Sequence, residues 1–307
     1  MPRKITVSTL SLRPGGGPRT VEMNVAAAER MIERAAALKP DIVCLPETFP
    51  TIGVTVSQAA DVDAQSFTVP GPITDRIAAL ARRHGMYVVC PLYEKQGNRV
   101  YNAGVLMDRR GHVAGIYHKV HPTLGELESG VTPGEKVEVF ETDFGRVGIL
   151  ICFDIMTPAR WREAKERGAE VVFWPSAYEG GLPLQARACD YEYYVVSATP
   201  VWGCHILDIT GYPIASTGQR LDIATAQIDL ERRLFSTDYN MAKVHAILAK
   251  YGRMVKINVL SPEGAFTLES DDPAVTVGDI AEEFGLETAQ DYFSRSGAAQ
   301  DGARRML

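Results

Sequence analysis

GRVGILICFDIMTPARW occupies residues 145–161 and contains the pattern that decides the fold. Its first part is an apolar run typical of a buried β-strand, and Cys152 stands at the end of that run. Pro158 then opens a stretch with helical spacing that reaches about Arg167, and Gly168 follows it. A strand that passes through a short turn into a helix predicts one unit of an α/β fold.

Strand and helix also alternate upstream of this stretch. The apolar runs ITVSTLSL, DIVCLPE and MYVVCPLYE predict strands, and residues 20–38 and 74–84 between them have helical spacing. From Val100 to Ile151 the predicted strands follow one another more closely, which favours hairpins added to a mixed sheet. We therefore expect one main α/β domain over residues 1–235.

The remainder of the chain, residues 236–307, has a different pattern. A helical stretch around 239–251 leads into a predicted hairpin, KINVLSPEGAFTLE, and the end is polar with several Gly and Arg residues. Phe266 and Tyr292 would have little core to join within such a segment. We expect a C-terminal extension that serves as an oligomerisation arm.

Composition limits the classes of function. The chain has 307 residues, 46% of them hydrophobic, which is enough for one large core. A net charge of −6 without a long run of like charge predicts no binding of nucleic acid or membranes. The N-terminus MPRKITVSTLSL lacks the apolar segment of a secretory signal, so a cytoplasmic protein with a small-molecule substrate is expected.

Signals for cofactors and metals are weak. The five cysteines have irregular spacing that fits neither a disulfide framework nor a CxxC zinc site, so we expect reduced thiols. The glycine clusters fit neither GxGxxG nor GxxxxGK. His118 and His121 form H-x-x-H without a third ligand, which favours a structural role. We expect neither a cofactor nor a metal ion.

Three reactive side chains follow predicted strands. Glu47 comes after DIVCLP, Lys119 near the end of VAGIYHKV and Cys152 after RVGILI. Taken singly, the first two are typical exposed residues and the third a typical small buried side chain. Because ligands bind at the carboxyl ends of strands in α/β sheets, the three could converge. The turn after Cys152 could also present the backbone N–H of Phe153 to a substrate.

Together these motifs resemble the nitrilase superfamily, also called the carbon–nitrogen hydrolases, in its amidase-like branch. The matching segments are LPETF around Glu47, YHKVHPT around Lys119, GRVGILICFD around Cys152, and WPSA downstream. Their order and separations fit the family, and the resemblance covers about residues 4–230. A chance coincidence of all four motifs is improbable.

The resemblance implies a four-layer αββα sandwich in the hydrolase domain, followed by the C-terminal arm. It implies that Cys152 attacks the substrate carbon while Glu47 accepts the thiol proton, and that Lys119 and the N–H of Phe153 stabilise the oxyanion. Trp174 and Tyr178, from WPSAYEGG, would line the substrate pocket. The family further implies at least a homodimer.

The family also has a second glutamate between the lysine and the cysteine. Counting forward from Lys119 selects Glu126, whereas counting back from Cys152 selects Glu128. The first is slightly favoured, and both remain candidates.

The leading hypothesis is a hydrolase that releases ammonia or an amine from a small amide or N-carbamoyl compound through a cysteine thioester. One alternative is a true nitrilase, which converts a nitrile to a carboxylic acid. Another is a catalytically silent oligomeric binding protein of the same fold. Met156 occupies a position where many members have arginine, and the first arginine after Cys152 is Arg160, so neutral substrates are expected over carboxylates.

Overall fold

The computed structural model describes residues 2–13, 17–54 and 62–306. The chain divides into two compact units. The larger unit runs from Ile5 to Ile228, and the smaller one contains the chain from Asp229 onward together with the first residues up to Lys4. The expected boundary after residue 235 falls inside strand β13 (Arg233–Ser236) of the smaller unit.

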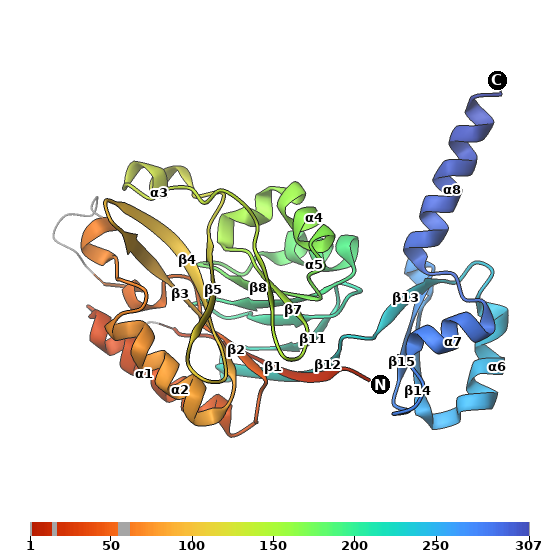
Figure 1. Cartoon of the computed structure of the whole chain (residues 1–307), viewed down its shortest axis with the longest axis horizontal. Coiled ribbons are helices and arrows are strands. Elements are labelled where there is room, and N and C mark those ends of the chain that lie inside the picture. Colours follow the sequence, from red (N-terminus) through yellow and green to blue (C-terminus); the bar gives the residue numbers. More distant parts are fainter. Residues whose placement is uncertain (1, 14–16, 55–61, 307) are drawn as a thin grey trace. The chain divides into compact units, whose positions relative to one another are not determined.

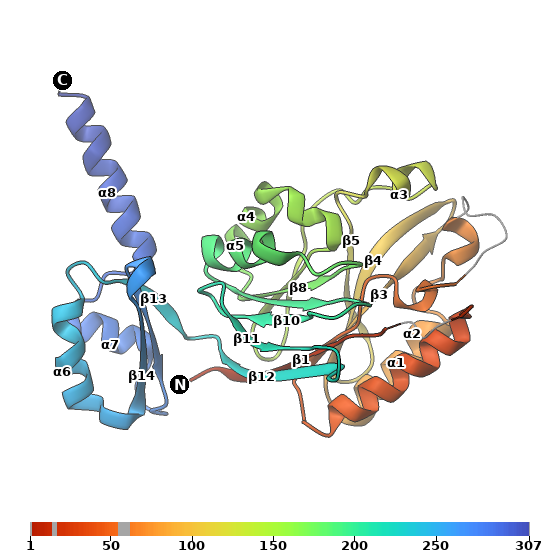
Figure 2. The ribbon, with the colours of Figure 1, turned by 180° about the vertical axis from the view of Figure 1, so that it is seen from behind.

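Two six-stranded sheets form the centre of the larger unit (Figure 1). The first sheet has the order β12 (Ile223–Asp229), β1 (Lys4–Leu10), β2 (Ile42–Cys44), β3 (Tyr87–Gln96), β4 (Arg99–Met107) and β5 (Val113–His118). The second has the order β11 (Pro213–Ser216), β10 (His205–Leu207), β9 (Tyr194–Ala198), β8 (Val171–Pro175), β7 (Arg146–Ile149) and β6 (Val139–Glu141). Figure 2 shows the second sheet from behind.

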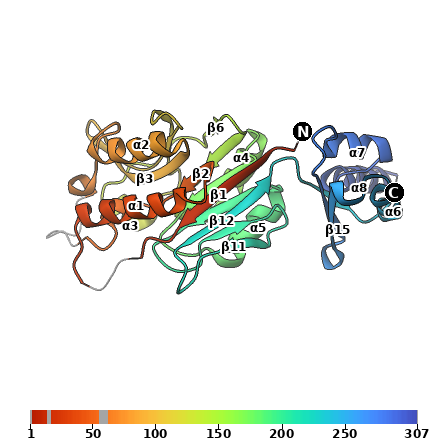
Figure 3. The same cartoon turned by 90° about the horizontal axis from the view of Figure 1, so that it is seen from below.

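Helices cover the outer faces of both sheets. The first sheet packs against α1 (Val21–Ala36) and α2 (Pro72–His84), which lie side by side (Figure 3). The second packs against α4 (Pro158–Glu166) and α5 (Gly181–Tyr191). The two sheets face each other, and the Thr9 hydroxyl donates a hydrogen bond to the Ser197 carbonyl across them, at 2.5 Å. The expected four-layer αββα sandwich is confirmed.

The directions of the strands determine which loops lie at the same edge of the first sheet. Strands β1, β2 and β3 are parallel, β4 turns back against β3, and β5 turns back against β4. Strand β5 therefore runs in the same direction as β2, and the carboxyl ends of both strands meet at one edge of the sheet. Glu47 follows β2 and Lys119 follows β5 at this edge.

The smaller unit has a sheet and a core of its own. Its antiparallel strands have the order β13, β15 (Ala265–Ser270) and β14 (Val255–Leu260), so the expected hairpin is present. The accompanying helices are α6 (Met241–Tyr251), α7 (Val277–Phe284) and α8 (Ala289–Arg304). Phe235, Phe266 and Ile280 belong to its buried core.

This core differs from the sequence expectation of an extension with little to bury. The polar composition after residue 270 concealed two helices. Thr276 accepts a hydrogen bond from the Asp279 N–H at 3.0 Å, and the Asp279 carboxylate accepts one from the Thr276 N–H at 2.7 Å. This reciprocal cap starts α7, whose Val277 and Ile280 are spaced to face the core. Within the described residues, no helix has the length and apolar character needed to cross a bilayer.

Candidate active site

Lys119 lies between two carboxylates. Its Nζ atom donates hydrogen bonds to Glu47 Oε1 at 2.9 Å and to Glu126 Oε2 at 2.7 Å. The three side chains are only 1%, 6% and 11% exposed, respectively. A buried cation of this kind needs paired charges, and the two carboxylates supply them.

Asn102 on β4 completes this group. Its Nδ2 atom donates to Glu47 Oε1 at 2.8 Å and to Glu126 Oε1 at 2.7 Å. The backbone N–H of Lys119 donates to the Asn102 carbonyl at 2.8 Å, so strand pairing sets the two residues side by side. The sequence motifs do not include Asn102. The available signal was a single amide within the apolar run VYNAGVLM, since a buried amide requires partners.

The two glutamate candidates have different surroundings. The short helix α3 (Leu124–Glu128) starts at Thr123, whose hydroxyl accepts from the Glu126 N–H at 3.2 Å, and Glu126 Oε2 accepts from the Thr123 N–H at 2.7 Å. This cap turns the Glu126 carboxylate back toward Lys119. Glu128 is exposed two residues later, and in the described structure it makes no contact with Lys119.

The charges in this group stabilise one another. Burial opposes the charged form of Lys119, but Glu47, Cys152 and Glu126 outweigh it and raise the pKa of the ammonium. Burial likewise opposes ionisation of Glu126, yet Lys119 and Asn102 lower the pKa of its carboxyl. The ammonium and the carboxylate are therefore the resting forms at neutral pH.

Cys152 stands where β7 turns into a short 3-10 helix, η3 (Cys152–Met156). Its φ angle is +45°, a left-handed conformation that is strained for a residue other than glycine, and Thr48 beside Glu47 has φ +41°. The Trp174 indole N–H donates to the Cys152 carbonyl at 3.0 Å and holds this turn in place. Strain at both the thiol and the carboxylate loop is typical of functional sites.

The electrostatic environment keeps the thiol protonated. Burial, followed by the Glu47 carboxylate, raises the pKa of Cys152 to about 12. Lys119, the Ala177 N–H and the Ser176 hydroxyl act in the opposite direction without cancelling the effect. A thiol in this state becomes nucleophilic only when a neighbouring base takes its proton.

Asp154 ties the cysteine turn to the lysine loop. This fully buried side chain accepts hydrogen bonds at Oδ2 from the Tyr117 hydroxyl (2.7 Å) and the Ile151 N–H (2.8 Å). Its Oδ1 atom accepts from the His121 N–H at 2.9 Å, just beyond Lys119. Sequence analysis assigned Asp154 no role, although the CFD motif contains it.

The family model described as carbon-nitrogen hydrolase matches residues 7–233 of this chain. The chain belongs to the carbon–nitrogen hydrolase family. An omega-amidase from Xenopus tropicalis is 26% identical over 234 residues, which cover 68% of this chain and 83% of that protein. The deaminated glutathione amidase of Synechocystis is 27% identical, with coverages of 68% and 87%.

Other relatives are longer. The nitrilase and fragile histidine triad fusion protein of Caenorhabditis elegans is 29% identical over 68% of this chain, which spans 54% of the fusion protein.

Among solved structures, a carbon–nitrogen hydrolase from Helicobacter pylori G27 has a TM-score of 0.66 at 18% identity, covering 82% of this chain and 96% of that one. An amidase from Nesterenkonia sp. has a TM-score of 0.61 at 22% identity, covering 80% and 95%. These structures share the hydrolase fold.

Phe153, Trp174 and Tyr178, the three residues expected near the substrate, differ in how far they are exposed. Phe153 and Tyr178 are 40% and 41% exposed beside the cysteine turn. Trp174 is fully buried, and its ring makes an edge-to-face contact with the Tyr178 ring, with the ring centroids 5.5 Å apart. The Trp174 indole therefore holds the Cys152 carbonyl, and its part in a substrate pocket stays a prediction.

The histidines of the H-x-x-H motif have separate partners. His118 Nε2 contacts Glu94 Oε2 at 2.6 Å, and its ring stacks on Tyr101 with centroids 4.1 Å apart. His121 lies beside Asp154. The described ranges contain no cluster of three or more His, Cys, Asp or Glu residues that could hold a metal ion.

Proposed function

We propose that this carbon–nitrogen hydrolase cleaves a small amide or N-carbamoyl compound through a thioester on Cys152. One observation carries the proposal. A protonated thiol lies within the electrostatic reach of a buried carboxylate, Glu47, whose position is fixed by Lys119 and Asn102. This arrangement supplies a nucleophile, a base and a cation in one buried group.

In the first step, Cys152 Sγ attacks the carbonyl carbon while Glu47 takes the thiol proton. Two of the three Lys119 N–H donors are used by Glu47 and Glu126, so the third is available for the oxyanion. The N–H of Phe153, at the start of η3, is the second donor, because the first N–H groups of a helix have no intrahelical acceptor.

In the second step, Glu47 passes its proton to the departing nitrogen, and ammonia or an amine leaves. The acyl group remains on sulfur as a thioester. Glu47 then removes a proton from water, hydroxide adds to the thioester carbon, and the thiolate regains the proton as the acid departs. Glu126 and Asn102 act as positioning residues, since they hold Lys119 and Glu47.

The relatives support this chemistry. The omega-amidase and the deaminated glutathione amidase carry amidase activity in their names. A solved structure of a mutant of the Nesterenkonia amidase, 20% identical to this chain, shows the acetamide moiety of fluoroacetamide added covalently at its active-site cysteine. A nitrilase from Pyrococcus abyssi is 31% identical over 59% of this chain, so nitrile hydrolysis is the second candidate.

The test is ammonia release across neutral amides, N-carbamoyl compounds and nitriles, with mass spectrometry for an acyl group on Cys152. We expect turnover of an amide or N-carbamoyl compound, loss of it in Cys152→Ala, and normal turnover in the matched control Cys189→Ala. Turnover of nitriles alone would favour the nitrilase. Turnover that survives in Cys152→Ala would refute the mechanism, and absence of both turnover and acylation would indicate a silent binding protein.

A further inference from the structure

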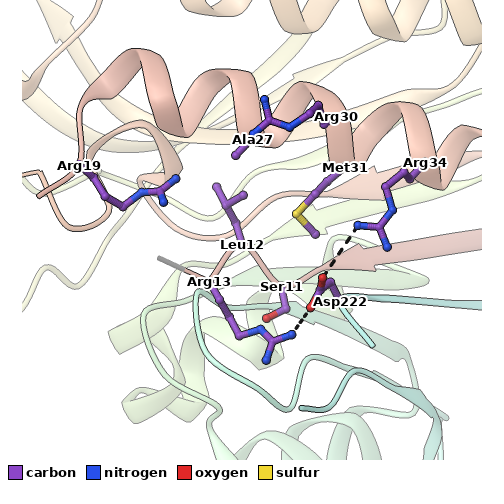
Figure 4. Close-up of a pocket in the computed structure, with 9 residues that line it drawn as sticks. All are labelled: Ser11, Leu12, Arg13, Arg19, Ala27, Arg30, Met31, Arg34 and Asp222. Atoms are coloured by element: carbon purple, nitrogen blue, oxygen red, sulfur yellow. Dashed lines mark hydrogen bonds and ion pairs between the residues drawn. The ribbon is translucent and has the colours of Figure 1, made fainter. Parts of the chain in front are cut away.

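A groove of about 510 Å³ lies on the larger unit, away from the residues of the proposed reaction. It is formed by one face of α1, the segment that follows β1 and the residue that precedes β12 (Figure 4). Its polar lining includes four arginines and one carboxylate, which are Arg13, Arg19, Arg30, Arg34 and Asp222.

The charges in the groove do not balance. Asp222 forms an ion pair with Arg13 and lies 3.9 Å from Arg34, and it is the only carboxylate among the described residues that line the groove. Arg30 has no ion pair within the described part of the chain. The Arg19 Nε–H donates to a neutral group, Asn24 Oδ1, at 2.5 Å. Four guanidinium groups against one carboxylate leave a net charge of +3 in the groove.

The acidic side chains of α1 are used elsewhere. Glu22 and Glu29 both bind Arg76 of α2, at 2.7 Å. Glu33 binds Arg83 and contacts His84 on the same helix. The helix thus directs its paired carboxylates toward α2 and its arginines toward the groove, within a chain whose net charge is −6. A concave cationic site on an acidic protein concentrates anions locally.

We propose that this groove binds a small polyanion with at least two phosphate or carboxylate groups. Guanidinium groups bind the oxygens of both anions in a bidentate manner, and several around one cavity require a ligand with more than one charged group. Leu12 and Met31 lie among the arginines in Figure 4, and both line the groove although they are largely buried. The site contains none of Glu47, Lys119 and Cys152, so its ligand is separate from the acyl group on sulfur.

The experiment titrates the full-length protein with pyrophosphate and with citrate by isothermal calorimetry at low salt. We expect saturable binding of at least one anion, weakened at least about tenfold in the double variant Arg30→Gln/Arg34→Gln and by added KCl. Both arginines are exposed, so the variant should retain the wild-type melting temperature. Preference for one probe over the other identifies phosphate or carboxylate as the ligand group.

The matched control is Arg82→Gln/Arg110→Gln, which removes the same charge from two exposed sites outside the groove. It should bind the anion as the wild type does, and so should Cys152→Ala. Absence of saturable binding to both probes, or equal weakening in the two double variants, would overturn the proposal.

Discussion

At neutral pH the Cys152 side chain carries its proton, because burial and the Glu47 carboxylate raise its pKa to about 12. A thiol of this kind differs from cysteines that react as preformed thiolates next to a cation. Its reactivity depends on proton transfer to Glu47 during attack. The two mechanisms differ in how alkylation depends on pH.

Alkylation of Cys152 by iodoacetamide should therefore be nearly independent of pH in the wild type, since Glu47 accepts the thiol proton during attack in the proposed reaction. In Glu47→Gln no base remains, and the rate should follow the thiolate fraction, rising about tenfold per pH unit. Loss of the carboxylate also lowers the pKa of Cys152, but burial is the larger cause of its shift and remains. The measurement is the labelling rate from about pH 6.5 to 8.5 by intact-protein mass spectrometry.

A Cys189→Ser background removes the exposed competing thiol and leaves Cys152 unchanged. Equal slopes in the wild type and in Glu47→Gln would exclude Glu47 as the proton acceptor.

Lys119 should contribute stability only when its partners are charged. The lowered pKa of Glu126 means that this contribution is present above the usual carboxyl range and is lost as pH falls through the folded value. The raised pKa of Lys119 means that the stabilising contribution is also present below about pH 10.5 and is lost as pH rises through the pKa of the folded protein. The pair therefore stabilises the protein across the neutral range.

Lys119→Met should thus cost roughly 3–5 kcal/mol of unfolding free energy at neutral pH, because a buried carboxylate loses its counter-ion. The deficit should shrink as pH falls toward 5, where Glu126 can take up a proton at lower cost. Urea denaturation of both proteins at several pH values measures this. A deficit that stays constant with pH would show that lost packing, and not charge, causes the destabilisation.

The sequence motifs select those candidate residues whose proposed roles depend on local order along the chain. Glu47, Lys119 and Cys152 each follow a strand, and strand direction brings those ends together. Asn102 pairs with Lys119 across a hairpin, and Asp154 accepts a hydrogen bond from Tyr117 of the other sheet. A linear motif shows neither contact. The cap at Thr123 turns Glu126 toward Lys119, a contact that spacing alone could not assign to either Glu126 or Glu128.

At the scale of elements, the segments around Cys152 determine which charged groups a substrate would meet in the proposed reaction. Within the described structure, Arg160 and Arg187, on the two helices that cover the second sheet, each have a carboxylate partner. Arg160 on α4 pairs with Glu163 at 2.9 Å. Arg187 on α5 donates to the Ile155 carbonyl at 3.2 Å and lies 3.6 Å from Asp190. A substrate carboxylate near the scissile bond would lose water without gaining a free cation there.

We therefore predict that a neutral amide is hydrolysed in preference to its carboxylate-bearing analogue of equal length. The measurement is kcat/KM for such a pair of substrates. The matched variant Asp190→Asn removes the one carboxylate paired with Arg187 in the described structure and should reduce the preference. A tenfold advantage for the carboxylate in the wild type, about 1.4 kcal/mol of transition-state preference, would contradict the prediction.

The elements themselves were predicted where apolar periodicity was strong. The helices expected at residues 20–38 and 74–84 occur as α1 and α2, with ends within two residues of those limits. Helices α7 and α8 were missed, because glycine, arginine and acidic residues dilute the apolar pattern of that segment. Their starts have the signal that composition hides, a threonine followed three residues later by aspartate.

At the scale of the whole molecule, the alternation of short strands and helices predicted an α/β domain, and the resemblance to the nitrilase superfamily implied the four-layer sandwich. The position of the boundary between the two units could not be predicted from the sequence in the same way. Strand β13 continues the chain directly after β12, and sequence does not show that its partner is β15 and not another strand of the large sheets. Pairing between distant segments is the information that a single sequence lacks.

The remaining prediction concerns assembly, and we propose that the smaller unit contributes to contacts between protomers. Helix α8 is 16 residues long, yet Ala289 is its only buried residue among those described, and Phe293 is 65% exposed. A helix of this length is marginally stable in water by itself, so a partner surface would stabilise it. A chain ending at Leu230 keeps every strand of the two six-stranded sheets.

This truncated chain should therefore remain folded and retain the alkylation behaviour of Cys152. The number of protomers per assembly, calculated from the native mass in light scattering, should be lower than for the full chain. Phe293→Asp in the full-length protein is the matched point variant. It places a charge where apolar surface would be buried, which weakens association without removing the unit. Full-length protein that is monomeric, or an unchanged number of protomers in both altered proteins, would show that the smaller unit has no part in assembly.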